Sequence, residues 1–340
     1  MSESLDRPGA GAVGLPEDGG GRPRIVVGVD GSPGSRAALR HALIAAGRRG
    51  ADLDVVSSYK LELYYVGGAP LDVPNVAAIQ KDYEGRAQAL VTEVQDELAS
   101  SSAAESRDVG ITVSVSSAPA AQALLDRSEG AALLVVGSRG RGAVRSALLG
   151  SVALHCVTHA TCPVVVVHAA TGDVARTGSV VVGVDGSEGS RAALAAAVDE
   201  AVRMGADVDV VAAYVPTDYW TDLTAVVVPA EQEIRSDLDQ RTRPLVEEVL
   251  AHRREQEGAL PAVRTEVHVG SAADVLIDRA RTADLLVVGS RGRGAFRGLL
   301  LGSIALRCAM RAPCPVMVVH LQASRTAGEA RPEPAMAAGS

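Results

Sequence analysis

The sequence predicts an α/β protein made of two tandem domains, each a doubly wound, five-stranded parallel sheet of the Rossmann-like type. Three observations support this fold class. The chain has 340 residues, too many for one ordinary core. Its apolar residues are mostly alanine, valine and leucine, which suits helices packed on covered parallel strands. One pattern of segments also occurs twice, at an offset of about 150 residues.

The repeat is close enough to align by eye. RIVVGVDGSPGSRAALRHAL at 24–43 returns as SVVVGVDGSEGSRAALAAAV at 179–198, and HATCPVVVVH at 159–168 returns as RAPCPVMVVH at 311–320. A duplicated domain explains this better than a solenoid, because there are only two copies.

The ends of the repeat suggest the domain boundaries. We expect one domain over 23–169 and a second over 179–320, joined by a short polar linker over 170–178. The flanking segments are rich in glycine, proline and alanine, and we expect them to be disordered tails at 1–22 and 321–340.

Within the first half, short continuous apolar runs predict buried strands at 25–29, 55–58, 111–116, 133–136 and 164–167. Helical spacing of apolar residues predicts helices at 33–49, 79–100, 120–128 and 152–158. In the second half, the charged stretch 231–257 predicts a long helix with a solvated face. Sheets of this kind bind ligands beyond the carboxyl ends of their strands, where the strand order switches.

Composition excludes several classes of function. The net charge is −8, so we expect no binding to nucleic acid or to an anionic membrane. With one phenylalanine and one tryptophan (Trp220, in a variable loop), the chain lacks the aromatic platforms that stack bases. The four cysteines form two pairs without zinc spacing, which predicts buried, reduced thiols in the cytoplasm: Cys156, Cys162, Cys308 and Cys314.

A glycine-rich turn follows the fourth expected strand of each half. Its skeleton is G-x-x-G, nine residues, then G-S, occupied by Gly137, Gly140, Gly150 and Ser151, and again by Gly289, Gly292, Gly302 and Ser303. Amide groups in such a turn form an anion-binding concavity, and the positive end of the next helix faces the same space. Four arginines add positive charge: Arg139, Arg141, Arg291 and Arg293. A phosphate chain fits this chemistry.

Simpler interpretations of these residues stay open. Glycines after a strand also occur in empty turns, and Ser151 and Ser303 could serve only as helix N-caps. Asp30 and Asp185 follow the first strand of each half, where they could bind ribose or a metal-bound phosphate, or could only build the turn. The motif is not a P-loop, since no G-K-[ST] is present.

These motifs resemble the universal stress protein family in its tandem bacterial form. The resemblance covers about residues 24–168 and 180–320, and its signature is the glycine skeleton of the ATP-binding members. It implies a strand order of 3-2-1-4-5 in each half. It also implies that the halves pair through their last strands at 164–167 and 316–319, which are apolar, uncharged edges. An additional homodimer is compatible with this arrangement.

The resemblance also assigns roles to residues. Asp30 and Asp185, each followed by a glycine (Gly31 and Gly186), match the turn near the ribose and the Mg²⁺-bound phosphate. The backbone of Ser58 and Ala213 matches the positions that contact adenine. Val136 and Gly137, with Val288 and Gly289, would line the adenosine. The phosphates would be held by Gly140, Gly150, Ser151 and Val152, and by Gly292, Gly302, Ser303 and Ile304, with Arg139 and Arg291 supplying charge.

The two halves differ at or near these positions. Ser58 stands against Ala213, Ser146 against Gly298 and His155 against Arg307, which suggests two sites of unequal affinity. The family often has glycine where Ala143 and Ala295 stand here.

Three functions are consistent with this pattern. The first is an ATP-binding regulatory protein of the stress or dormancy response, with an adenine nucleotide and Mg²⁺ in each half and an unidentified protein partner. The second is a slow ATPase or phosphotransfer protein, and the third is an interaction scaffold that does not use nucleotide. Hydrolysis needs a group that orients water, and the sequence offers none at a defined place, which favours the first function.

Overall fold

The computed structural model describes residues 21–59, 65–66, 69–70, 75–100, 108–141, 149–169, 177–215, 231–255, 260–293 and 300–321. The predicted tails fall almost wholly outside these ranges, as do residues 170–176 of the predicted linker, Trp220, and the differences at 143, 146, 295 and 298.

The first half contains β1 (Arg24–Gly28), α1 (Pro33–Arg49), β2 (Asp52–Ser58), β3 (Tyr65–Val66), β4 (Ala69–Pro70), α2 (Val76–Ser100), β5 (Ile111–Ser116), α3 (Ala120–Ser128), β6 (Leu133–Gly137), α4 (Ser151–His159) and β7 (Val164–Val167). The second half contains β8 (Ser179–Gly183), α5 (Glu188–Met204), β9 (Asp207–Tyr214), α6 (Glu231–Glu255), β10 (Val263–Val269), α7 (Ala272–Arg279), β11 (Leu285–Gly289), α8 (Ser303–Arg311) and β12 (Val316–Val319).

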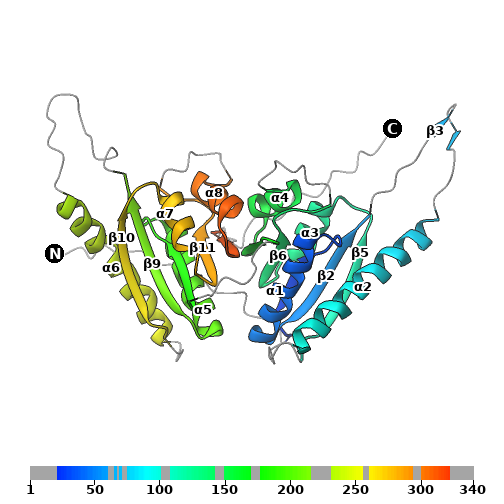
Figure 1. Ribbon diagram of the computed structural model, residues 1–340, viewed down its shortest axis with the longest axis horizontal. Coiled ribbons are helices and arrows are strands. Elements are labelled where there is room, and N and C mark those ends of the chain that lie inside the picture. Colours follow the sequence, from blue (N-terminus) through cyan, green and yellow to red (C-terminus); the bar gives the residue numbers. More distant parts are fainter. Residues whose placement is uncertain are drawn as a thin grey trace, which may run out of the picture.

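Ten of the strands form one sheet that runs through both halves, in the order β10-β9-β8-β11-β12-β7-β6-β1-β2-β5. Each half therefore contributes five strands in the order 3-2-1-4-5, and these five strands are parallel to one another. The two halves lie side by side with α8 and α4 next to the junction (Figure 1). The predicted fold class is confirmed.

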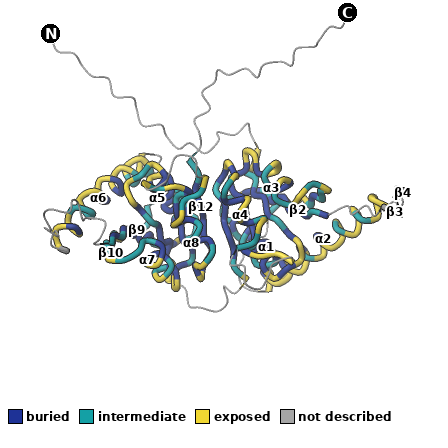
Figure 2. Tube along the Cα trace, turned by 90° about the horizontal axis from the view of Figure 1, so that it is seen from above, coloured by how far each residue is buried: buried dark blue, intermediate teal, exposed yellow. Residues whose placement is uncertain are grey.

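The halves meet where β7 pairs with β12 in antiparallel register, with Val165 opposite Met317. Both strands are fully buried, and Figure 2 shows this buried seam between the two halves. The pairing of the last strands that the sequence predicts is thus present within one chain. Uncharged edges of this kind satisfy their backbone groups by pairing with each other.

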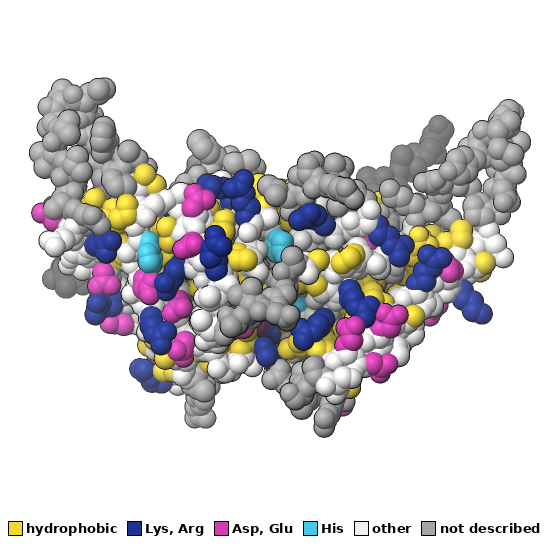
Figure 3. Space-filling model, viewed as in Figure 1, with side chains coloured by type: hydrophobic (Ala, Val, Ile, Leu, Met, Phe, Trp, Pro, Cys, Tyr) yellow, Lys and Arg dark blue, Asp and Glu magenta, His cyan; other side chains and the backbone are white. Residues whose placement is uncertain are grey.

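Helices cover both faces of the sheet, as continuous apolar strands require. One core cluster lies under α1, α2, α5 and α6, and the other lies under α3, α4, α7 and α8. On the outer faces of the helices, basic and acidic side chains lie next to one another (Figure 3). An example is Arg36 of α1, which pairs with Glu93 and Glu97 of α2.

The predicted boundaries of the first helix, α1, agree with the structure because capping residues stand at both of its ends. The Ser32 hydroxyl accepts a hydrogen bond from the Ser35 amide, Pro33 occupies the first turn, and Gly50 ends the helix with φ of 59°. The helix begins and ends at these residues because they satisfy its free backbone groups.

The structure differs from the prediction in two places. The second strand begins at Asp52 rather than at residue 55, because the buried Asp54 is stabilised there by the Ser114 hydroxyl at 2.8 Å and by Arg127 at 3.1 Å. The short β3-β4 hairpin was not predicted. The other boundaries agree to within a few residues.

A histidine at the end of each last strand lies against the opposite half. His320 follows β12, and its Nε2 donates a hydrogen bond of 2.9 Å to the Val157 carbonyl of α4. His168 follows β7 and lies next to the backbone of Ala309 and Met310 of α8. Burial lowers the pKa of both histidines, and the neighbouring backbone groups oppose the shift only in part.

We expect acidification to destabilise the protein through these two imidazoles. Because their folded-state pKa lies below the ordinary value of 6.5, the unfolded chain takes up protons first as the pH falls. The stability is therefore complete above about pH 6.5 and declines below it. Melting temperatures between pH 7.5 and pH 5.5 should fall in wild type, and less steeply in a His168→Leu/His320→Leu variant. A His155→Leu/His159→Leu variant is the control, and equal slopes in all three proteins would contradict the expectation.

Candidate functional site

A cavity of about 400 Å³ opens in the first half, at the carboxyl ends of β1, β2 and β6. Helices α3 and α4 complete its walls. This volume falls in the range of small-molecule sites, and the location is where parallel α/β sheets bind ligands. The cavity is lined by nine of the ten first-half residues that the sequence predicts: Asp30, Ser58, Val136, Gly137, Arg139, Gly140, Gly150, Ser151 and Val152.

The tenth predicted residue, Gly31, is not part of the cavity lining and lies in the adjoining turn, next to Asp30. Its φ is 77°, a conformation that favours glycine. A Cβ atom there would lie 2.5 Å from the Arg141 guanidinium, so the absence of a side chain lets that group pack on the turn.

Asp30 connects the turn after β1 to the glycine-rich turn after β6. One carboxylate oxygen accepts the Ser32 amide at 2.9 Å, and the other accepts the Arg141 amide at 2.8 Å. Burial raises the pKa of Asp30, but hydrogen bonds from Ser32, Arg141 and Ser35 outweigh it and leave the pKa below the ordinary value. Asp30 is therefore ionised at neutral pH, and it builds the turn as well as lining the cavity.

Three glycines allow the backbone segments around the cavity to approach closely. A Cβ atom on Gly140 would lie 2.5 Å from a carboxylate oxygen of Asp30. A Cβ atom on Gly34, in the first turn of α1, would lie 2.4 Å from the Arg139 carbonyl oxygen, and one on Gly137 would lie 2.6 Å from the Gly34 carbonyl carbon. The glycine-rich turn therefore rests directly on the start of α1.

The amino terminus of α4 faces the cavity without a side-chain cap. Gly150 is the N-cap residue, and no described side chain caps the helix. Ser151 is thus the first helical residue, and the interpretation of Ser151 and Ser303 as N-caps is wrong. The same holds for α8, whose N-cap is Gly302. By contrast, Ser32 and Ser187 cap α1 and α5.

This difference leaves free hydrogen-bond donors at the cavity. The first amides of a helix have no partner inside the helix, and its N-terminus carries partial positive charge. Ser151, Val152 and Ala153 occupy these positions and line the cavity. Together with Arg139 and Arg141, they form a wall that suits an anion.

The second half repeats these contacts. Asp185 accepts the Ser187 amide at 2.9 Å and the Arg293 amide at 2.8 Å, and its pKa is lowered by the same balance of burial and hydrogen bonds. Gly186 has φ of 77°, and a Cβ atom on Gly292 would lie 2.4 Å from Asp185. The remaining predicted residues lie at the equivalent positions: Ala213 in β9, Val288 and Gly289 at the end of β11, Arg291, Gly302, Ser303 and Ile304.

The predicted differences between the halves have structural consequences. The Ser58 hydroxyl donates to the Ala118 carbonyl oxygen at 2.5 Å, a contact that Ala213 cannot make in the second half. His155 is exposed, stacks on His159 and does not line the cavity. Arg307, its counterpart, binds Asp274 at 2.8 Å.

Sequence reasoning missed several residues of the site. Gly34 and Gly189 support the glycine-rich turns, although they lie about 100 residues away from them. The signal was a glycine kept in the first turn of both copies of the first helix, where glycine is unfavourable. The cavity is also lined by Gly28, Val29, Ser35, Val56, Ala120, Leu124 and Ala153.

Other features of the described residues narrow the chemistry. The four cysteines are buried and take part in no disulfide. Burial raises the pKa of Cys156 and Cys308 to about 12, so these two thiols are poor nucleophiles. Within the described ranges, no group of three or more His, Cys, Asp or Glu side chains could hold a metal ion. Among the helices that the structure describes, none combines the length and hydrophobicity needed to cross a bilayer.

Comparison with known proteins gives one family. The model of the universal stress protein family matches residues 21–168 and again residues 177–320. A universal stress protein of Mycolicibacterium smegmatis is 34% identical over 306 residues, which is 87% of this chain and 96% of that protein. One from Mycobacterium tuberculosis is 35% identical over 305 residues, with the same coverage. The crystal structure of a universal stress protein from Archaeoglobus fulgidus has a TM-score of 0.57 at 19% identity and covers 87% of this chain and 98% of its own.

Proposed function

Since the chain belongs to the universal stress protein family, we propose that it is a regulatory protein of the stress response that binds one adenine nucleotide in each half. In this proposal the nucleotide controls conformation or the binding of a protein partner. ATP is the ligand we assign to both sites. A partner protein and an additional homodimer remain predictions.

One observation carries this proposal: the uncapped amino terminus of α4 faces a cavity of about 400 Å³ beside a turn that places Gly140 against Asp30. Free amides at a helix N-terminus bind phosphate oxygens without further charged groups. Arg139 and Arg141 supply the positive charge that a P-loop lysine would otherwise provide. The phosphates of the nucleotide would lie here.

The cavity lining also has an apolar part that suits a nucleobase. This part comprises Val29, Val56, Leu124 and Val136. Ser58, at the end of β2, lines the cavity as well, and its hydroxyl is already bonded to Ala118. The backbone of Ser58 would therefore contact adenine, while its side chain stays hydrogen-bonded to Ala118 in the cavity wall.

Each proposed site offers one carboxylate, Asp30 or Asp185, as a ligand for Mg²⁺. The ionised carboxylate of Asp30 lines the cavity beside the glycine-rich turn, and its two oxygens also accept backbone hydrogen bonds from Ser32 and Arg141. Magnesium is usually held by one or two carboxylates together with substrate phosphates. Asp30 in the first half and Asp185 in the second half would each hold one ion together with the phosphates of the nucleotide. The ion would neutralise phosphate charge.

Binding rather than turnover is the activity that this geometry favours. The titratable side chains that line the described cavity are Asp30, Arg139 and Arg141. The lowered pKa of Asp30 makes it a weak base, and its oxygens are committed to the turn. A general base needs a pKa near the working pH. We therefore assign no catalytic residue, and weak hydrolysis is the second candidate.

The decisive experiment compares nucleotide binding in wild type with Gly140→Asp, Gly292→Asp and the double variant. Each aspartate would place a Cβ atom within 2.5 Å of Asp30 or Asp185 and add negative charge beside the phosphates. Acid extraction of the purified protein and calorimetric titration with ATP–Mg²⁺ should give two equivalents in wild type, one in each single variant and none in the double variant.

The control is Gly85→Asp, which adds the same charge on α2 where a Cβ atom would meet nothing within 4 Å. It should bind two equivalents. If folded wild type contained no nucleotide and gave no heat with ATP, the proposal would fail and a nucleotide-independent scaffold would take its place.

A further inference from the structure

A second cavity lies at the opposite end of the sheet, between the two halves. Its volume is about 410 Å³, similar to that of the nucleotide site. The first half contributes the segment that enters β1, the end of α1 and the residues before β6 and β7, while the second half contributes α5 and Met317 of β12. Ligand sites occur preferentially at such domain interfaces.

The lining of this junction cavity is basic, although the protein as a whole is acidic. It carries four arginines and two carboxylates: Arg22, Arg24, Arg49, Arg203, Asp199 and Glu200. Glu200 pairs with Arg49 and, at 2.9 Å, with Arg203. Asp199 pairs with Arg253 of α6. The single carboxylate of Glu200 is thus shared by two guanidinium groups, so the cavity lining keeps a net positive charge.

The ion pair between Arg49 and Glu200 is almost completely shielded from solvent. The side chains of Arg49 and Glu200 are 9% and 10% exposed. Burial lowers the pKa of Arg49, Glu200 opposes the shift, and the cations Arg203 and Arg48 add to it. An anion in the cavity would offset this repulsion among buried cations.

The remaining two arginines have donors to spare. Arg24 donates to the Glu129 carbonyl oxygen at 2.8 Å. Arg22 donates to the carbonyl oxygens of Gly50 and Asp108, and its guanidinium lies 3.5 Å from the Asp52 carboxylate and 3.8 Å from the Asp108 carboxylate. A guanidinium group carries five N–H donors in a planar fork that matches phosphate or carboxylate. Both side chains can therefore bind an anion while they keep these contacts.

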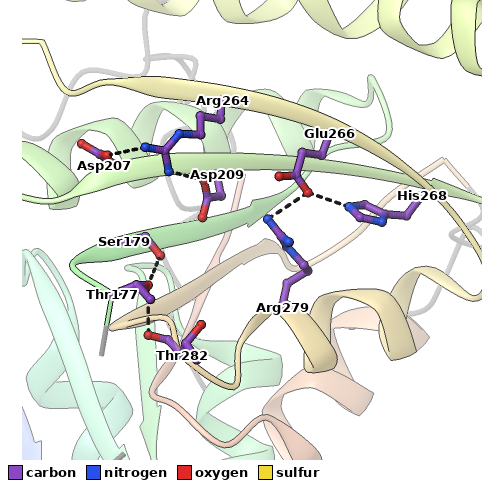
Figure 4. Close-up of polar contacts among 9 residues, drawn as sticks. All are labelled: Thr177, Ser179, Asp207, Asp209, Arg264, Glu266, His268, Arg279 and Thr282. Atoms are coloured by element: carbon purple, nitrogen blue, oxygen red, sulfur yellow. Dashed lines mark hydrogen bonds and ion pairs between the residues drawn. The ribbon is translucent and has the colours of Figure 1, made fainter. Parts of the chain in front are cut away.

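The repeat shows that the fold does not require these cations. In the second half, the positions of Arg22, Arg24 and Arg49 are occupied by Thr177, Ser179 and Met204. The Thr177 hydroxyl forms hydrogen bonds with the Ser179 hydroxyl at 2.9 Å and with the Thr282 carbonyl oxygen at 3.2 Å (Figure 4). Two hydroxyl groups thus stand where the first half has the guanidinium groups of Arg22 and Arg24. Three of the four arginines that line the cavity thus come from the first half and have uncharged counterparts in the second half.

We propose that the junction cavity binds a small multivalent anion that carries phosphate or carboxylate groups. Two anionic groups on one ligand would contact Arg22 and Arg24 at one end and Arg49 and Arg203 at the other. Because the walls come from both halves, the ligand stabilises their pairing. The inference does not depend on nucleotide binding at the carboxyl ends of the strands.

The test uses pyrophosphate and citrate as separate probes, in calorimetry and in thermal unfolding. The parent protein is Gly140→Asp/Gly292→Asp, so that the nucleotide sites do not take up the probe. We expect one equivalent of at least one probe to bind and to raise the melting temperature, and the preferred probe distinguishes phosphate from carboxylate. Adding Arg22→Thr/Arg24→Ser, the residues of the second half, should weaken binding about tenfold or more.

A matched control adds Arg86→Ser/Arg241→Ser to the same parent. These two arginines are more than half exposed, pair only along their own helices, and change the net charge equally. The control should bind as the parent does. Absence of binding to both probes, equal binding after Arg22→Thr/Arg24→Ser, or an equal loss in the control would each overturn the proposal. In wild type the Arg22→Thr/Arg24→Ser change should remove one equivalent of probe, a readout that does not require the parent variant to fold.

Discussion

Gly34→Ala is expected to weaken nucleotide binding strongly in the first half and to leave the second half unchanged. A Cβ atom at residue 34 would lie 2.4 Å from the Arg139 carbonyl oxygen, which belongs to the backbone of the glycine-rich turn. Because neither backbone segment can move alone, the turn must shift away from α1 and lose its position beside α4. We expect affinity at this site to fall by about a hundredfold and stability to fall by about 1–3 kcal/mol.

Two further variants make this expectation specific. Gly189→Ala should remove the second site instead, because its Cβ atom would lie 2.3 Å from the Arg291 carbonyl oxygen. Gly85→Ala is the control: nothing lies within 4 Å, so it should leave binding intact and add up to about 1 kcal/mol of helix stability. Calorimetric stoichiometry and urea unfolding give the readouts. Two sites of unchanged affinity in Gly34→Ala would refute the contact as the support of the turn.

Glu200→Ala is expected to destabilise the protein by about 3–5 kcal/mol, because it leaves the buried Arg49 without its carboxylate. The loss should appear in chemical unfolding at neutral pH. An exposed ion pair gives the comparison: Asp82→Ala, which removes the partner of Arg86 on α2, should cost less than about 1 kcal/mol.

The repeat supplies the compensating change. At the positions equivalent to Arg49 and Glu200, the other half carries Met204 and Ala45. The double variant Arg49→Met/Glu200→Ala should therefore recover most of the stability that Glu200→Ala loses, since no uncompensated charge stays buried. If the double variant were as unstable as the single one, the cost would come from packing rather than from charge.

The ion pair also bears on how the halves recognise each other. In a symmetric dimer of identical domains, a residue and its counterpart must satisfy the same contacts. The counterpart positions of Arg49 and Glu200 carry Met204 and Ala45, so the ion pair has no copy on the other side of the pseudo-two-fold axis. The tandem arrangement permits this asymmetry.

Much of the site could be predicted from the sequence because its strongest signals are local. Ser32, Pro33 and Gly50 mark the ends of α1 within a few residues of one another, and the glycine skeleton follows β6 directly. Nine of the first-half residues, chosen from the motif or from the family resemblance, meet at one cavity because parallel strands bring their carboxyl ends to one edge. The strand order itself came from the resemblance to a family rather than from any local pattern.

The residues that were missed depend on distant partners. Gly34 contacts Arg139, and Arg49 contacts Glu200 across the two halves. The start of β2 was placed too late because Asp54, a polar residue in a strand, is stabilised by Ser114 and Arg127, which follow far along the chain. No local pattern contains these pairs.

The sequence by itself therefore determined the duplication, the fold class, the apolar last strands and the glycine-rich turns, because each of these depends on hydrophobic spacing or backbone freedom over short stretches. Only the tertiary structure decided that Gly150 rather than Ser151 is the N-cap of α4, that Asp30 holds the turn through both oxygens, and that four arginines line one junction cavity. These features require side chains and amides from separate segments to meet, and contact across a fold is fixed by packing rather than by spacing along the chain.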